Sequence, residues 1–160
     1  MATNDQITRV WKVLYQPART RKLLEHVNNV DVLMNLNWQR TIPANDARAR
    51  AGTGPNWFYP ANGKVNESVL KAADQCEKIA ALLLDIQRDL APVDFPAADK
   101  RHLRAGLAAQ ADAWRARARV WRAPGKPNVE AASAAIVKHE RTSFKELGRV
   151  TAYFKQVGPS

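Results

Sequence analysis

The chain has 160 residues, of which 46% are apolar and 25% charged, and its formal net charge is +10. This composition is that of an ordinary globular protein, and the length suits one domain, residues 1–160. No apolar run reaches the roughly 18 residues of a membrane span, and a single cysteine excludes an intramolecular disulfide framework. The N-terminus lacks the basic start and apolar stretch of a secretory signal, so we expect a cytoplasmic protein.

The first predicted elements are two N-terminal helices. Thr3 and Gln6 have the spacing of a capping box, and apolar residues then recur at helical spacing until Pro17 disfavours continuation. A second helix, or a kinked extension of the first, is predicted to reach about Arg40. Apolar residues in 30–38 also alternate as in a strand, but the asparagines between them and the lack of an obvious second strand favour helix.

A long loop is predicted from Pro43 to Lys64, because this segment holds three prolines, three glycines and three asparagines. Loops of about 22 residues inside compact domains are usually functional or disordered. Trp57 and Tyr59 can either plug the surface of the bundle or stack on nucleic-acid bases, in the latter case with help from Arg48 and Arg50.

Three long helices are predicted to follow, over residues 65–90, 97–122 and 129–157. The connections between them are short and rich in proline, which indicates antiparallel neighbours. The expected fold is all-α: an up-and-down bundle of three long helices, with an N-terminal helical pair and the 43–64 loop. Cys76 falls on an apolar face, where an inert, buried thiol is expected.

The helix predicted over residues 65–90 carries acids and bases at spacings that allow them to pair within the helix. Its acids have bases three or four residues away, in the pairs Glu67 with Lys71, Asp74 with Lys78, and Asp85 with Arg88. We therefore expect these acids to be less available to cancel charges on other helices.

The most informative feature is a row of arginines in the helix predicted over residues 97–122. At 100° per residue they share an arc of roughly 60°, and we call them the arginine stripe: Arg101, Arg104, Arg115, Arg119 and Arg122. An apolar seam that includes Trp114 and Trp121 lies beside them and is expected to enter the core. Segment 97–126 holds eight Lys and Arg against two Asp, a net +6. Such a row needs an anionic partner or open water, and the alternative to a partner is a solvated face on which Asp112 pairs with an arginine.

Motifs for catalysis are missing. His139 and Glu140 begin like a zinc-protease helix, but position 143, which would need a second histidine, is Ser. There is no G-x-S-x-G nucleophile elbow, phosphate-binding loop or dinucleotide fingerprint. We therefore expect no enzyme, no metal, no cofactor and no small-molecule substrate.

The leading functional hypothesis is a non-enzymatic accessory subunit that contacts the backbone of RNA or single-stranded DNA with little sequence preference, together with other protein subunits. The candidate contact residues are Arg101, Arg104, Arg115, Arg117, Arg119, Arg122, Lys126, Arg48, Arg50, Trp57 and Tyr59. The alternative is a structural helical-bundle protein, such as a phage virion or scaffold component, that docks an acidic protein. Neither hypothesis involves a membrane.

In size, helical character and basic balance, with the arginine stripe on a predicted bundle helix, the chain resembles the small subunits of multi-protein CRISPR effector complexes. These subunits are helical bundles that line the path of guide RNA and target strand. The resemblance implies assembly into a ribonucleoprotein without nuclease activity. Those subunits have no diagnostic motif, so the resemblance transfers no role to an individual residue.

Overall fold

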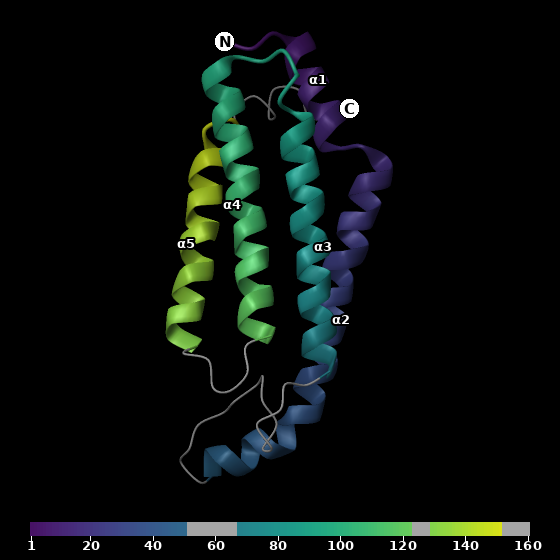
Figure 1. Cartoon of the computed structure of the whole chain (residues 1–160), viewed down its shortest axis with the longest axis vertical. Helices are drawn as coiled ribbons and strands as arrows, with labels where there is room; N and C mark the ends of the chain where they lie inside the picture. Colours follow the sequence, from purple (N-terminus) through teal and green to yellow (C-terminus); the bar gives the residue numbers. More distant parts are fainter. Residues whose placement is uncertain (51–66, 123–128, 152–160) are drawn as a thin grey trace.

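The computed structural model describes residues 1–50, 67–122 and 129–151, and for the helical segments 38–50 and 129–133 it describes the backbone alone. These ranges hold five helices and no strand, so the all-α prediction is confirmed. The helices are α1 (Asn4–Leu14), α2 (Pro17–Arg50), α3 (Glu67–Asp89), α4 (Ala97–Arg122) and α5 (Val129–Gly148), shown in Figure 1.

The predicted start of α1 is confirmed in atomic detail. The Gln6 backbone N–H donates to Thr3 Oγ1 at 3.2 Å, and the Thr3 N–H donates to Gln6 Oε1 at 2.9 Å, so the capping box is complete. The helix ends at Leu14, and Pro17 occupies the first position of α2, where its missing N–H costs nothing. Residues 30–38 are helical, as preferred, rather than a strand.

The loop was predicted to begin at Pro43, but α2 continues through this proline to Arg50. The residues after Pro43 include several Ala and Arg, which are strong helix formers, and sharp bends within a continuing helix commonly occur at proline. Figure 1 shows the distal part of α2 running at an angle to the rest of the helix. With 34 residues, α2 is a full-length member of the fold rather than half of a short N-terminal pair. Residues 51–64 of the predicted loop lie outside the described ranges.

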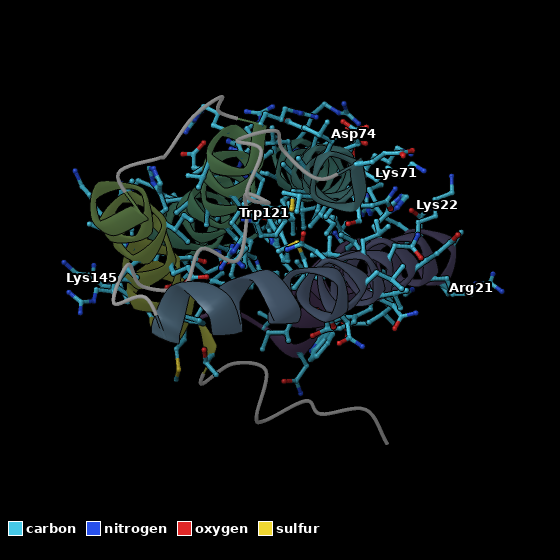
Figure 2. The ribbon with its side chains drawn as sticks, turned by 90° about the horizontal axis from the view of Figure 1, so that it is seen from below. Arg21, Lys22, Lys71, Asp74, Trp121 and Lys145 are labelled. Carbon is cyan, nitrogen blue, oxygen red and sulfur yellow. The ribbon has the colours of Figure 1, made fainter. Side chains whose placement is uncertain are left out.

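The long helices are arranged in chain order as an up-and-down array. α3 packs against α2 on one side and α4 on the other, α4 packs against α3 and α5, and α1 touches α3 at one end of the molecule. Seen along the helices, α2, α3, α4 and α5 follow a curve, with Trp121 on its inner side (Figure 2). We call the side of α4 and α5 that points away from the inside of this curve the outer face.

Two clusters of buried apolar side chains hold the array together. One lies where α1 crosses α3, α4 and the end of α5, and it includes Ile7, Ile86 and Leu103. The other lies between α2, α3 and α4, and Trp114 and Trp121 pack against it. The expectation that these two tryptophans belong to the apolar seam is therefore confirmed.

The contact between α4 and α5 is built from small residues. Ser143 Oγ donates to the Gly106 carbonyl oxygen at 2.9 Å, and a Cβ added to Gly106 would lie 2.6 Å from the Leu147 side chain. Ala109 and Ala113 of α4 are also buried. The two backbones therefore approach closely along this seam.

The last helix is shorter than predicted. α5 ends at Gly148 rather than at Val157, and the next two residues form a turn in which the Val150 N–H donates to the Leu147 carbonyl at 3.1 Å. Glycine is a poor helix former and a common residue at helix ends, which explains the stop. Residues 152–160 lie outside the described ranges.

Candidate nucleic-acid interface

Three arginines of the stripe, Arg101, Arg115 and Arg119, lie on the outer face of α4 without a charged partner. Arg101 and Arg119 are exposed and Arg115 is half-buried. Within the described residues none of the three forms an ion pair, and Asp112 does not pair with Arg115 or Arg119. The ion pair of Asp112 that the alternative included is therefore not formed, but Asp112 is itself exposed and falls within about 20° of Arg101 and Arg119 on the helical wheel.

The other two arginines of the stripe are tied to α3. Arg104 Nε donates to the Gln87 carbonyl oxygen at 3.1 Å. Arg122 donates to Asp74 Oδ1 at 2.5 Å and to Glu77 Oε1 at 3.1 Å, and these carboxylates, Asp74 first, raise the pKa of its guanidinium. Both side chains lie at the α3 border of the outer face and are partly committed to structural contacts.

The ion pairs of α3 follow the sequence prediction only in part. Lys71 with Glu67 at 2.8 Å and Arg88 with Asp85 at 3.0 Å form as predicted. Asp74, however, pairs with Arg122 of α4 rather than with a base of its own helix. The predicted pair of Asp74 with Lys78 is therefore wrong. The packing of α4 on α3 brings Arg122 within reach of Asp74 instead.

Arg117 faces inward and is not part of the outer face. It pairs with Glu140 of α5, and its guanidinium carbon lies 4.8 Å from the ring centroid of Trp114. Its side chain is only 22% exposed. Sequence analysis grouped Arg117 with the stripe by proximity along the chain, but it lies on the opposite side of the helix, so its assignment as a contact residue is corrected.

Helix α5 and the turn after it add exposed bases that sequence analysis missed: Lys138, Arg141 and Lys145 on the helix, and Arg149 in the turn. The two acids in the described side chains of this helix are turned toward α4. Glu140 binds Arg117, and Glu146 Oε2 lies 2.5 Å from His102 Nδ1. The hydrogen bond from His102 is the main reason why the pKa of Glu146 is lowered.

The position of these bases follows from the contacts of α5 with α4. Glu146 and Arg149 both meet His102, with Arg149 Nη1 at 3.3 Å from Nε2, so Arg149 lies on the outer side of the α4–α5 contact. Lys138 and Lys145 lie about 20° apart on the helical wheel of α5 and at least about 140° from Ser143 and Glu140, which meet α4. Figure 2 shows Lys145 pointing away from the array, on the side opposite Arg21 and Lys22. The sequence already contains four bases from residue 138 to residue 149. Only the fold shows that Glu140 and Glu146 turn toward α4 and do not pair with these four bases.

We define the outer basic face by six exposed or half-buried cations of α4, α5 and the turn after α5: Arg101, Arg115, Arg119, Lys138, Lys145 and Arg149. The remaining predicted contact residues are not placed there. Lys126, Trp57 and Tyr59 lie outside the described ranges, as do the side chains of Arg48 and Arg50.

Other features add no candidate for catalysis. Within the described residues no group of three His, Cys, Asp or Glu could hold a metal ion. An apolar hollow of about 380 Å³ between α1, α3, α4 and α5 is lined by Leu14, Tyr15, Ile86, Leu103, Leu107, Leu147, Val150 and Thr151, without a carboxylate, imidazole or thiol among these residues. Cys76 is fully buried, and burial raises the pKa of its thiol to about 12, as expected for an unreactive cysteine. None of the described helices has the length and apolarity needed to cross a membrane.

Comparison with known proteins identified no relative: no family model, no curated protein and no solved structure matches the chain.

Proposed function

We propose that this protein is a non-enzymatic accessory subunit that binds the phosphate backbone of a nucleic acid through the outer basic face. The observation that carries the proposal is the direction of the acids. Glu140 and Glu146 of α5 point at α4, while the bases of the same helix point outward. These acids therefore do not cancel the exposed bases of α5, and Asp112 is the described acid that falls among the cations of the outer basic face.

The chemistry of the face suits phosphate better than bases. Guanidinium and ammonium groups donate several hydrogen bonds to anionic oxygens, and here they project from two rigid helices. Contacts of this kind carry little sequence information and make binding strongly dependent on salt. Low sequence preference is accordingly part of the proposal.

Assembly with other protein subunits, in the manner of the small CRISPR subunits that the chain resembles, is part of the same proposal. A small helical protein with one basic face can cover backbone within a larger ribonucleoprotein and leave sequence selection to base pairing or to other subunits.

A second candidate function is a helical scaffold that docks an acidic protein. The observation that favours it is a pair of exposed apolar side chains on α5, Val137 at 39% and Phe144 at 69% exposed. They lie seven residues apart, on one flank of the helix, as contact residues of a partner helix often do. Protein interfaces of this kind depend far less on salt than phosphate binding does.

The test is binding of a fluorescent mixed-sequence RNA of about 20 nucleotides, and of its duplex, from about 50 to about 200 mM salt. The variant Arg115→Glu, Arg119→Glu and Lys138→Glu removes cations of the outer basic face. Its matched control, Lys12→Glu, Arg21→Glu and Lys22→Glu, makes the same change of net charge at exposed bases of α1 and α2.

We expect salt-dependent binding by the parent, with a slope of log affinity against log salt of about −2 to −5. The outer-face variant should lose most of this slope, and the control should keep most of it. Absence of binding by the parent, or equal losses in the two variants, would contradict the proposal and favour the scaffold function.

A further inference from the structure

His102 of α4 contacts a charged group through each of its ring nitrogens. Its Nδ1 lies 2.5 Å from Glu146 Oε2 of α5, and its Nε2 lies 3.3 Å from Nη1 of Arg149 in the turn after α5. Arg149 is one of the six cations of the outer basic face. A single imidazole therefore connects a carboxylate to a cation of the proposed binding surface.

These two contacts determine where the ring of His102 carries its proton. A guanidinium has N–H donors and no acceptor, so Arg149 can bond only to a ring nitrogen without a proton. An ionised carboxylate only accepts, so Glu146 bonds to a ring nitrogen that carries one. The arrangement therefore requires a neutral imidazole, in which Nδ1–H donates to Glu146 and the lone pair of Nε2 accepts from Arg149.

A second proton on His102 breaks one of the two contacts and keeps the other. The proton enters at Nε2, where an N–H then faces the N–H groups of Arg149 and two positive charges meet. The contact with Glu146 is retained and becomes an ion pair. Glu146 stays ionised meanwhile, because the hydrogen bond from His102 holds the pKa of this carboxyl below its ordinary value. Protonation thus frees Arg149 and adds a positive charge at the same place.

The charged groups near His102, in the described part of the chain, belong to α4, α5 and the turn after α5. They are Asp99 and Arg101 on α4, Lys145 and Glu146 on α5, and Arg149 in the turn. Lys100 is directed elsewhere, because its Nζ donates to the carbonyl oxygens of Ala91 and Val93. Arg101, Lys145 and Arg149 are cations of the outer basic face, so a change of charge at His102 acts directly on that surface.

We infer that His102 is a pH-dependent switch on the outer basic face, which holds Arg149 while neutral and releases it to bind phosphate when protonated. This inference rests on the proposed function and adds a means of regulating it. Imidazole is the side chain that ordinarily changes charge between about pH 5 and 8. Nucleic-acid binding therefore tightens as the pH falls through this range, and the gain exceeds that of one added charge because Arg149 becomes available as well.

The test combines a binding measurement with a measurement on the free protein. Binding of a fluorescent mixed-sequence RNA of about 20 nucleotides is titrated at about pH 8 and about pH 5.5, across salt concentrations. His102→Asn keeps an N–H donor for Glu146 but takes up no proton, and Arg149→Gln removes the released cation. His139→Gln, which removes the imidazole of α5, is the matched control.

The measurement on the free protein is nitrogen NMR of the imidazole, which reports which ring nitrogen of His102 carries the proton at about pH 8. It needs no variant and no nucleic acid, so the inference can be tested even if His102→Asn does not fold. We expect the proton on Nδ1, since Nε2 accepts from Arg149.

We expect the parent to bind the RNA about three- to tenfold more tightly at the lower pH, with a salt slope steeper by about 1 to 2. The control should keep this pH response, His102→Asn should lose most of it, and Arg149→Gln should keep less than half. A full response in either of these two variants, or a proton on Nε2 at the higher pH, would overturn the inference while the proposed function stands. If the parent binds RNA at neither pH, the proposed function itself fails.

Discussion

Two exposed surfaces of this protein, the outside of α3 and the outer basic face of α4 and α5, carry many charges and differ in how those charges are satisfied. On α3, Glu67 and Asp85 neutralise bases of their own helix, and Asp74 binds Arg122. On α5, both acids with described side chains point into the contact with α4. The sign of a helical surface therefore depends on where its acids point as much as on how many there are.

The largest effect that tests this comparison concerns two arginines of α4 that lie two residues apart. Arg117→Ala leaves Glu140 half-buried without its partner and removes the contact with Trp114. We expect a loss of about 2 kcal/mol in the free energy of unfolding and little change in nucleic-acid binding. Arg119→Ala should do the opposite, with stability changed by no more than about 0.5 kcal/mol and weaker binding. Chemical denaturation measures the free energy of unfolding, and a titration measures binding. Equal stabilities of the two variants would show that the pair of Arg117 with Glu140 contributes nothing.

The next effect comes from adding acids to the outer basic face, where Asp112 is the described acid among the cations. Ala105→Glu with Thr142→Glu adds two carboxylates at exposed positions of α4 and α5, and we expect about tenfold weaker nucleic-acid binding near 100 mM salt. Asn28→Glu with Ala81→Glu adds the same charge at exposed positions of α2 and α3 and serves as the control. If the control weakens binding as much, net charge rather than the face determines affinity.

The converse change should make the α3 surface more basic. Glu67→Gln with Asp85→Asn removes the carboxylate partner of Lys71 on α3 and leaves Arg88 with Asp89 alone. We expect nucleic-acid binding to tighten by about two- to fivefold, with a melting temperature close to that of the parent because exposed pairs contribute little. Unchanged affinity would show that the α3 surface does not reach the bound nucleic acid.

The smallest expected effect is on the pH dependence of stability. The hydrogen bond from His102 holds the pKa of Glu146 below its ordinary value of 4.5. A lowered folded-state pKa stabilises the protein above the unfolded pKa, and this stabilisation is lost as the pH falls through the folded-state pKa. We therefore expect Glu146→Gln to melt slightly earlier than the parent at neutral pH and at the same temperature in strong acid. Asp112→Asn, at an exposed carboxyl without an ion pair, is the control, and an equal effect there would contradict the role of Glu146.

Much of the fold could be predicted because local signals were consistent. The capping box at Thr3, the bounds of α4 and the helical state of residues 30–38 follow from short-range patterns, and the structure has them as predicted. Errors arose where a helix-breaking residue was given too much weight, at Pro43, or too little, at Gly148. Pro43 was predicted to lie in a loop and is inside α2, and α5 was predicted to pass Gly148 and ends there.

The sequence by itself determined that the chain is helical, that one face of α4 carries a row of arginines and that Cys76 is buried, because helical periodicity is a property of neighbouring residues. Only the tertiary structure decided which charges remain on the surface. It paired Arg122 with Asp74, turned Arg117 toward Glu140, and brought Arg149 beside His102 of α4. These outcomes depend on which helices are neighbours and in what register they pack, and side chains far apart in the chain meet only when that packing is complete.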